Sequence, residues 1–165
     1  MRVPLGGFLL VLVLIAAQLG WYSPRLPQTV ISSFALDGSA GGWSPRGTFL
    51  ATYVIVVAVT AASFLLLPPL LRRLGGQGLN IPHRDYWLAP ERADATMEHI
   101  ARQLVWFGLV TVAFLGWTHQ LVILANLGGE GRMASAPFWA GLAAFLAYAA
   151  WWTLRLTLRF QRRPR

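Results

Sequence analysis

Apolar residues fill four long stretches of this chain, and none of these stretches contains a charged side chain. The stretches are Val3–Pro24, Gly47–Leu71, Gln103–Gly129 and Met133–Leu154. Each exceeds the ~20 residues that an α-helix needs to cross a bilayer. A helix on the surface of a soluble domain keeps one polar face, which these stretches lack. The pattern therefore predicts an all-α integral membrane bundle of four transmembrane helices, at about 4–22, 48–71, 103–127 and 136–158.

The segment 23–47, between the first two predicted spans, is rich in Pro, Gly and Ser, which disfavour helix. Within it, Thr29–Leu36 has the composition of a strand and Asp37-Gly38 is a favoured turn pair, so we expect a small β-hairpin. Its apolar side chains should leave water and pack over the mouth of the bundle, near Gln18 and His119. These side chains are Leu26, Val30, Phe34 and Trp43.

Prolines mark the borders of the segment 72–102, between the second and third spans. We expect Pro68-Pro69 to end or kink the second helix, because proline lacks an amide donor and clashes with the preceding turn. We expect Pro90 to be the first residue of a helix that continues into the third span.

Small residues fill the fourth span and would let helices approach closely in lipid. The chain is thus predicted to be one membrane domain, residues 1–165.

The distribution of charge predicts the orientation. Only 12% of the 165 residues are charged, and the net charge is +8. Every basic residue is Arg, and only Arg25, Arg46 and Arg132 follow the first or third span. The others lie at the two termini or in 72–102, and positive charge stays in the cytoplasm. Both termini should therefore be cytoplasmic, with the basic tail near anionic lipid and no need for a nucleic-acid partner.

The first span has a second interpretation. Arg2, the apolar run Leu9–Ile15 and Ala16-Ala17 also fit a cleaved signal peptide, which would leave three spans in the same orientation. We favour a span, because the apolar stretch continues to Trp21. The chain has no Cys, which excludes disulfides and thiolate metal sites.

His119 is the candidate for intramembrane chemistry. It is the titratable side chain inside a predicted span, and on a helical wheel it shares a face with Gly108, Gly116 and Asn126. This face should point into the bundle, with Gln18 as a hydrogen-bonding partner. Ionisable residues inside a membrane are often functional. The alternative is a neutral His that hydrogen-bonds a neighbouring helix for packing, and the sequence favours this alternative slightly.

No catalytic arrangement accompanies His119. We find no Ser/His/Asp set, phosphate loop or paired carboxylate motif, so we expect no enzymatic activity. His83, Asp85, Glu98 and His99 lack the spacing of metal ligands and are better explained as surface polarity. We therefore expect no metal and no cofactor.

Two loop stretches carry a family resemblance. The first is Leu26–Phe34, then Asp37-Gly38 and Gly42–Arg46, followed at once by a span; the second is Asn80–Arg92. Both resemble a bacterial membrane family catalogued as domain of unknown function 1648, a module found in SdpI-like immunity proteins. Ser33 stands where this family usually has a His before Phe34, so a role of that His is not carried over.

The resemblance implies a multi-pass protein of the bacterial cytoplasmic (inner) membrane and no established reaction. Its best-known relatives protect against a secreted toxic peptide and signal to a cytoplasmic regulator. We therefore expect a non-enzymatic binding, sensing or immunity-type protein, with a peptide or small ligand outside and a cytoplasmic or membrane protein partner inside. The alternative is a transporter, or an accessory subunit of a larger membrane complex, formed by homo-oligomerisation through the fourth span. A membrane enzyme has only His119 and loop carboxylates in its favour.

The candidate ligand- or partner-binding residues come from the loops and from the polar face of the third span. They are Gln18, Phe34, Asp37, Trp43, Asp85, Tyr86, Trp87, Glu91, His119 and Asn126.

Overall fold

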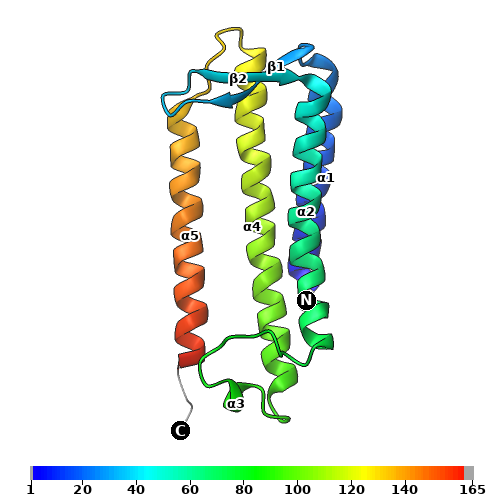
Figure 1. The fold of residues 1–165 in the computed structure, drawn as a ribbon, viewed down its shortest axis with the longest axis vertical. Helices are drawn as coiled ribbons and strands as arrows, with labels where there is room; N and C mark the ends of the chain where they lie inside the picture. The colour runs from blue at the N-terminus through cyan, green and yellow to red at the C-terminus, as the bar shows by residue number, and fades with distance from the viewer. Residues whose placement is uncertain (1, 162–165) are drawn as a thin grey trace.

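The computed structural model describes residues 2–161 as a row of long helices capped by a hairpin at one end (Figure 1). Following the chain, the elements are α1 (Arg2–Tyr22), a short 3-10 turn η1 (Ser23–Arg25), β1 (Thr29–Phe34), β2 (Ala40–Pro45), α2 (Arg46–Arg73), α3 (Arg84–Trp87), α4 (Ala93–Leu127) and α5 (Ser135–Gln161). The two strands lie across what we call the hairpin end, and α3 lies at the opposite end.

Three helices of the described chain are long and apolar enough to cross a membrane. They are the α1 region Pro4–Arg25, α2 and α4. The helix expected at 136–158 is present as α5, but it is not among these three, and tryptophans and a tyrosine interrupt its alanines and leucines. The helical fold is confirmed, and three helices of the described chain could span a membrane by length and composition, but the expected count of four spans is not confirmed.

Helix α4 is the centre of the bundle, because it packs against α1, α2 and α5. The main core lies where α1, α2 and α4 meet. Its buried members are Phe8, Ile15, Tyr53, Val57, Ala61, Val105 and Val112. Gly108 lets α4 approach α2 closely, since a Cβ atom at this position would lie 2.4 Å from the Cβ of Phe64.

Helix α5 packs on one side of α4, mainly through aromatic rings. Phe107 lies 4.6 Å from Trp152 and Phe114 lies 4.7 Å from Phe145, measured between ring centroids. Gly141 also contacts α4, where an added Cβ atom would lie 2.7 Å from the indole nitrogen of Trp117. Most alanines of α5 are exposed, so the small residues that we expected at a helix interface are largely unused within this chain.

The expected hairpin forms, but only part of its predicted packing is correct. Leu26 and Val30 are buried against Ile123 of α4. Trp43, however, is 64% exposed. The strand register explains this: Val30 pairs with Ser44, and Ile31 pairs with Trp43. Because neighbouring residues of a strand point to opposite faces, turning Val30 and Ser44 inward turns Trp43 outward.

Two expectations about where helices end and begin near proline are also wrong. Helix α2 does not end at Pro68-Pro69 but continues to Arg73, because proline has helical φ and removes only the two hydrogen bonds that its own nitrogens would donate. Helix α4 begins at Ala93 rather than at Pro90. Pro90 instead occupies a turn in which the amide of Arg92 donates to the carbonyl of Ala89 at 2.8 Å, a position that suits its fixed φ.

Candidate functional site

Asn126, in the last turn of α4, fixes the hairpin to the bundle. Its Oδ1 accepts from the amide of Ile31 at 2.7 Å, and its Nδ2 donates to the carbonyl of Ile31 at 3.0 Å. The same Nδ2 donates to the carbonyl of Val122 at 2.9 Å. The side-chain amide thus pairs with β1 as a neighbouring strand would, and it sets the height of the hairpin above the helices.

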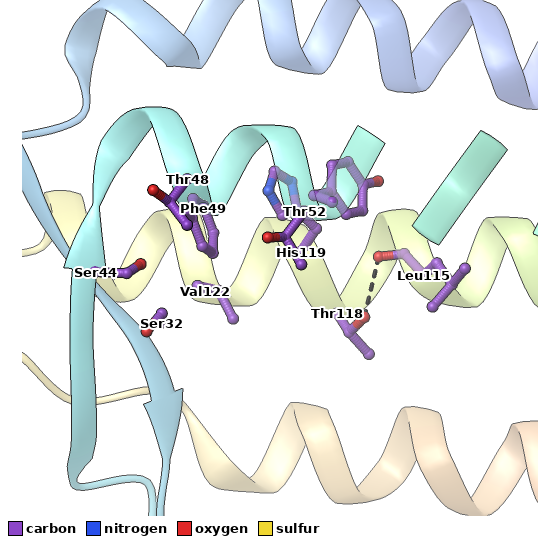
Figure 2. A pocket seen from close by; sticks show the side chains of 10 residues that line it. Ser32, Ser44, Thr48, Phe49, Thr52, Leu115, Thr118, His119 and Val122 are labelled. Carbon is purple, nitrogen blue, oxygen red and sulfur yellow. Dashed lines mark hydrogen bonds between the residues drawn. The ribbon is translucent and has the colours of Figure 1, made fainter. Parts of the chain in front are cut away.

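Beneath the hairpin, a cavity of about 400 Å³ lies between α2 and α4; we call it the hairpin cavity. Helices α2 and α4 form its sides, and Ser32 and Ser44 of the two strands lie at its hairpin end (Figure 2). Most of its polar side chains are hydroxyls, and none is acidic. It is lined by Ser32, Ser44, Thr48, Phe49, Thr52, Tyr53, Leu115, Thr118, His119 and Val122.

His119 contacts α1 through the predicted partner, Gln18. The His119 Nδ1 atom lies 3.3 Å from Gln18 Oε1. Gln18 Nε2 donates in turn to Gln120 Oε1 at 2.8 Å and to the carbonyl of Gly116 at 3.2 Å. The predicted polar face of α4 therefore does point into the bundle, and Gln18 joins α1 to it.

Two aromatic rings of α2 hold the imidazole of His119 in place. The Tyr53 ring is stacked on it with centroids 3.5 Å apart and an angle of 1° between the planes. The Phe49 ring lies 5.1 Å away at 16°. His119 is only 5% exposed, so its ring is enclosed by α1, α2 and the rest of α4.

Buried polar atoms without a partner concentrate at this cavity. Within residues 2–161, four buried side-chain polar atoms have no hydrogen-bond partner, and three of them belong to lining residues: Ser44 Oγ, Tyr53 Oη and His119 Nε2. Buried polar atoms are normally paired, because an unpaired one costs about 1–3 kcal/mol. These three atoms come from β2, α2 and α4, and each is enclosed by the side chains around it although its residue lines the cavity.

A second, smaller cavity of about 270 Å³ continues toward α5. It shares Ser32, Thr118 and Val122 with the hairpin cavity, so the two adjoin under the strands. Phe34, one of the predicted site residues, lines this second cavity.

The tip of the hairpin is tied to the loop before α5. Asp37 forms an exposed ion pair with Arg132, with 3.4 Å between Oδ2 and the guanidinium. The amide of Met133 donates to the carbonyl of Gly38 at 2.9 Å, and the indole of Trp139 donates to the carbonyl of Leu36 at 3.3 Å. The hairpin therefore contacts both α4 and the start of α5.

The remaining predicted residues gather at the opposite end. The indole Nε1 of Trp87, in α3, donates to the carbonyl of Phe160 in α5 at 3.0 Å, and their rings meet edge-on at 5.3 Å. Arg92 lies over the Tyr86 ring, 4.1 Å from its centroid. Asp85 and Glu91 are exposed there. The predicted residues thus form two groups at opposite ends, and within the hairpin-end group Trp43 faces outward.

Sequence reasoning missed the α2 side of the site. Tyr53 is the tyrosine of the second span and Phe49 precedes it by one helical turn, a spacing that places both on one face. A hydroxylated aromatic inside an otherwise apolar span was the available signal.

No family model, no curated protein and no solved structure matches this chain.

Proposed function

We propose that this protein is a non-enzymatic binding protein of the bacterial cytoplasmic membrane, which takes a small ligand into the hairpin cavity from the outer side. The observation that carries this proposal is the hairpin cavity itself, whose lining combines hydroxyl side chains and His119 with the apolar Phe49, Leu115 and Val122. A cavity of about 400 Å³ has the size of a small-molecule site, which typically spans ~300–1,000 Å³.

In this proposal four helices cross the membrane, with α5 as the fourth, and both termini lie in the cytoplasm. The charge distribution supports this orientation, because the arginines concentrate away from the hairpin end. The resemblance to the SdpI-like family supports a sensing or immunity role. A cytoplasmic or membrane protein partner would then meet the α3 end, where Trp87 joins the connector to α5.

Purification from native membranes tests the proposal. The natural protein would be compared with Val122→Trp, which fills the space shared by both cavities, and with Val56→Trp, a control at a residue 44% exposed on α2. Mass spectrometry of the extracted molecules should find a species with the natural protein and the control that is absent from Val122→Trp. The same set of molecules on all three would contradict the proposal.

A transporter or an accessory subunit is the second candidate, because the exposed alanines of α5 offer a face for oligomerisation. Solute flux in proteoliposomes that disappears in His119→Leu would favour it over a binding protein.

A further inference from the structure

Helices α4 and α5 keep one antiparallel register along the seam between them (Figure 1). The ring of Phe107 meets that of Trp152, and the ring of Phe114 meets that of Phe145. The two pairs are equally far apart on both helices, so each step toward the start of α4 matches a step toward the end of α5. Continued in this direction, the register brings the start of α4 beside the end of α5, close to the α3 end of the molecule.

This register brings three arginines to nearly the same height. Arg155 falls level with Leu104 of α4. Arg159 falls level with Ile100, so Arg102 lies between the two heights. Arg155 and Arg159 are one helical turn apart and therefore share a face of α5. All three arginines are exposed, so they form a charged surface shared by two helices.

The three arginines also act on a single side chain, that of His99. This residue precedes the charge-free stretch that begins at Gln103, and it is partly buried. Its pKa is lowered from 6.5 to about 4, first by burial and then by the charges of Arg159, Arg102 and Arg155. No carboxylate contributes to this shift. The three guanidinium groups therefore surround one part of the seam between α4 and α5.

These arginines have no carboxylate partner in the described chain. Within residues 2–161, the ion pair that forms is Asp37–Arg132, at the hairpin end. Arg155 instead lies over the ring of Trp151, 5.1 Å from its centroid. Like charges held near one another repel, and an anion between them removes this repulsion. Guanidinium groups suit phosphate in particular, because they donate paired, charge-assisted hydrogen bonds to its oxygens.

The surface beside the arginines is apolar, which favours a lipid over a free ion. Trp151, Leu154 and Leu158 lie at helical spacing on α5 and are all exposed; we call them the apolar stripe. An exposed tryptophan at the end of a span favours the level of the lipid headgroups. A lipid phosphate at the arginines would have its acyl chains along this stripe, whereas an inorganic phosphate would leave the stripe uncovered.

We propose that Arg102, Arg155 and Arg159 together bind the phosphate of an anionic phospholipid, whose acyl chains lie along the apolar stripe of α5. In the proposed orientation this lipid belongs to the inner leaflet. The site differs from the general attraction of a basic tail to anionic lipid, because it includes Arg102 of α4. It lies at the end opposite the hairpin cavity and does not depend on what that cavity binds.

Native mass spectrometry of the full-length protein in detergent tests this site. The protein would be titrated with phosphatidylglycerol or with phosphatidylcholine of identical chains, and one phosphatidylglycerol should bind more tightly than the first phosphatidylcholine. Arg102→Gln and Arg159→Gln should each weaken phosphatidylglycerol binding by about 5-fold, the effect of one basic side chain at an anionic surface. The matched control is Arg73→Gln, which removes the same charge from an exposed residue at the end of α2 and should leave this binding unchanged.

The other outcomes would overturn the proposal. Equal losses in Arg73→Gln and Arg102→Gln would mean that only the overall charge attracts the lipid, and equal affinities for the two lipids would mean that the headgroup is not recognised. Displacement of phosphatidylglycerol by an equal concentration of inorganic phosphate would identify a site for a free anion instead. Val122→Trp should leave phosphatidylglycerol binding unchanged, so failure of the hairpin cavity as a ligand site is detected separately. All the substituted arginines are exposed, so unfolding temperatures should stay the same and confirm that each variant folds.

Discussion

At the scale of residues, the hairpin end depends on a few side chains with defined geometry. Gly108 allows α2 and α4 to touch, Asn126 sets the hairpin and Asp37 anchors its tip. Gly108 acts through close packing, Asn126 through hydrogen bonds and Asp37 through its charge. Conservative substitutions at these three positions therefore test the three effects separately.

Gly108→Ala should destabilise the bundle by about 1–3 kcal/mol, because the new methyl group would overlap the Phe64 side chain close to its backbone, where it cannot move aside. Thermal unfolding in detergent measures this loss. The matched control is Gly20→Ala in α1, where a Cβ atom meets nothing within 4 Å. The control should be neutral or slightly stabilising, since Ala is the better helix former. Equal effects of the two substitutions would contradict the close contact.

The pKa of Asp37 is held below its usual value of 3.8, first by hydrogen bonds from the hydroxyl and amide of Ser39 and then by the charge of Arg132. A lowered pKa means that the folded hairpin tip favours the carboxylate form of Asp37. The stabilisation of the tip by this carboxylate is therefore complete above pH 3.8 and is lost as the pH falls through the lowered pKa of the folded protein. An NMR titration of the carboxyl carbon should show Ser39→Ala raising this pKa more than Arg132→Gln does. The opposite order would refute this account.

At the scale of elements, the sequence predicts the helices and the hairpin well. Runs without charge mark the helices, and Asp37-Gly38 marks the turn. It could not predict that Trp43 faces outward, because one step of strand register decides which side chains turn inward, and this hairpin has two irregularities in its register. Tyr53 was missed for a related reason: its role arises from the approach of α2 to α4, which no local pattern encodes.

The hairpin should lift from the bundle when Asn126 loses its amide. Asn126→Ala removes both hydrogen bonds to Ile31. Asn126→Asp keeps an acceptor for the Ile31 amide but places a carboxylate oxygen opposite the Ile31 carbonyl. Both substitutions should therefore weaken the clamp. Hydrogen exchange at the Ile31 amide should become faster in both. Asn80→Ala, at an exposed residue of the far loop, serves as the control and should leave this exchange unchanged.

Trp87 should hold α3 to α5 by its ring and its N–H together. Trp87→Phe keeps an aromatic ring but loses the bond to the Phe160 carbonyl, and Trp87→Ala loses both. Protease cleavage between Gly78 and Arg92 should increase slightly for Phe and strongly for Ala. If Trp87→Ala fails to capture a partner from membranes while the protein still folds, the segment is a binding surface. If the natural protein, Trp87→Phe and Trp87→Ala are all cleaved equally, the segment is only a tether.

At the scale of the whole molecule, the structure is a core of α1, α2 and α4 with α5 added on one side. Whether α5 crosses the membrane decides the orientation of everything after Gly131, and the sequence alone predicts that it does. It is not among the three helices that are apolar enough to span by composition, but its tryptophans favour the membrane interface, where their rings and N–H groups are both accommodated.

Fusions to a reporter that works only outside the cytoplasm test this topology. The reporter should be active after Asp37 and after Gly131, and silent after Gly78 and after Arg165. Activity after both Gly131 and Arg165 would show that α5 does not cross. An active fusion at Gly78 would overturn the orientation that the arginines predict.

The one-sided attachment of α5 also bears on the order in which the protein is made. The ribosome synthesises α1, the hairpin, α2 and α4 before α5, and these segments together supply the core and the Asn126 clamp. Both can therefore form before α5 has been translated. Trp87 is translated midway, yet its partner Phe160 is among the later residues to emerge. The connector between α2 and α4 can therefore make this contact only after the end of α5 has been synthesised, later than the core and the clamp can form.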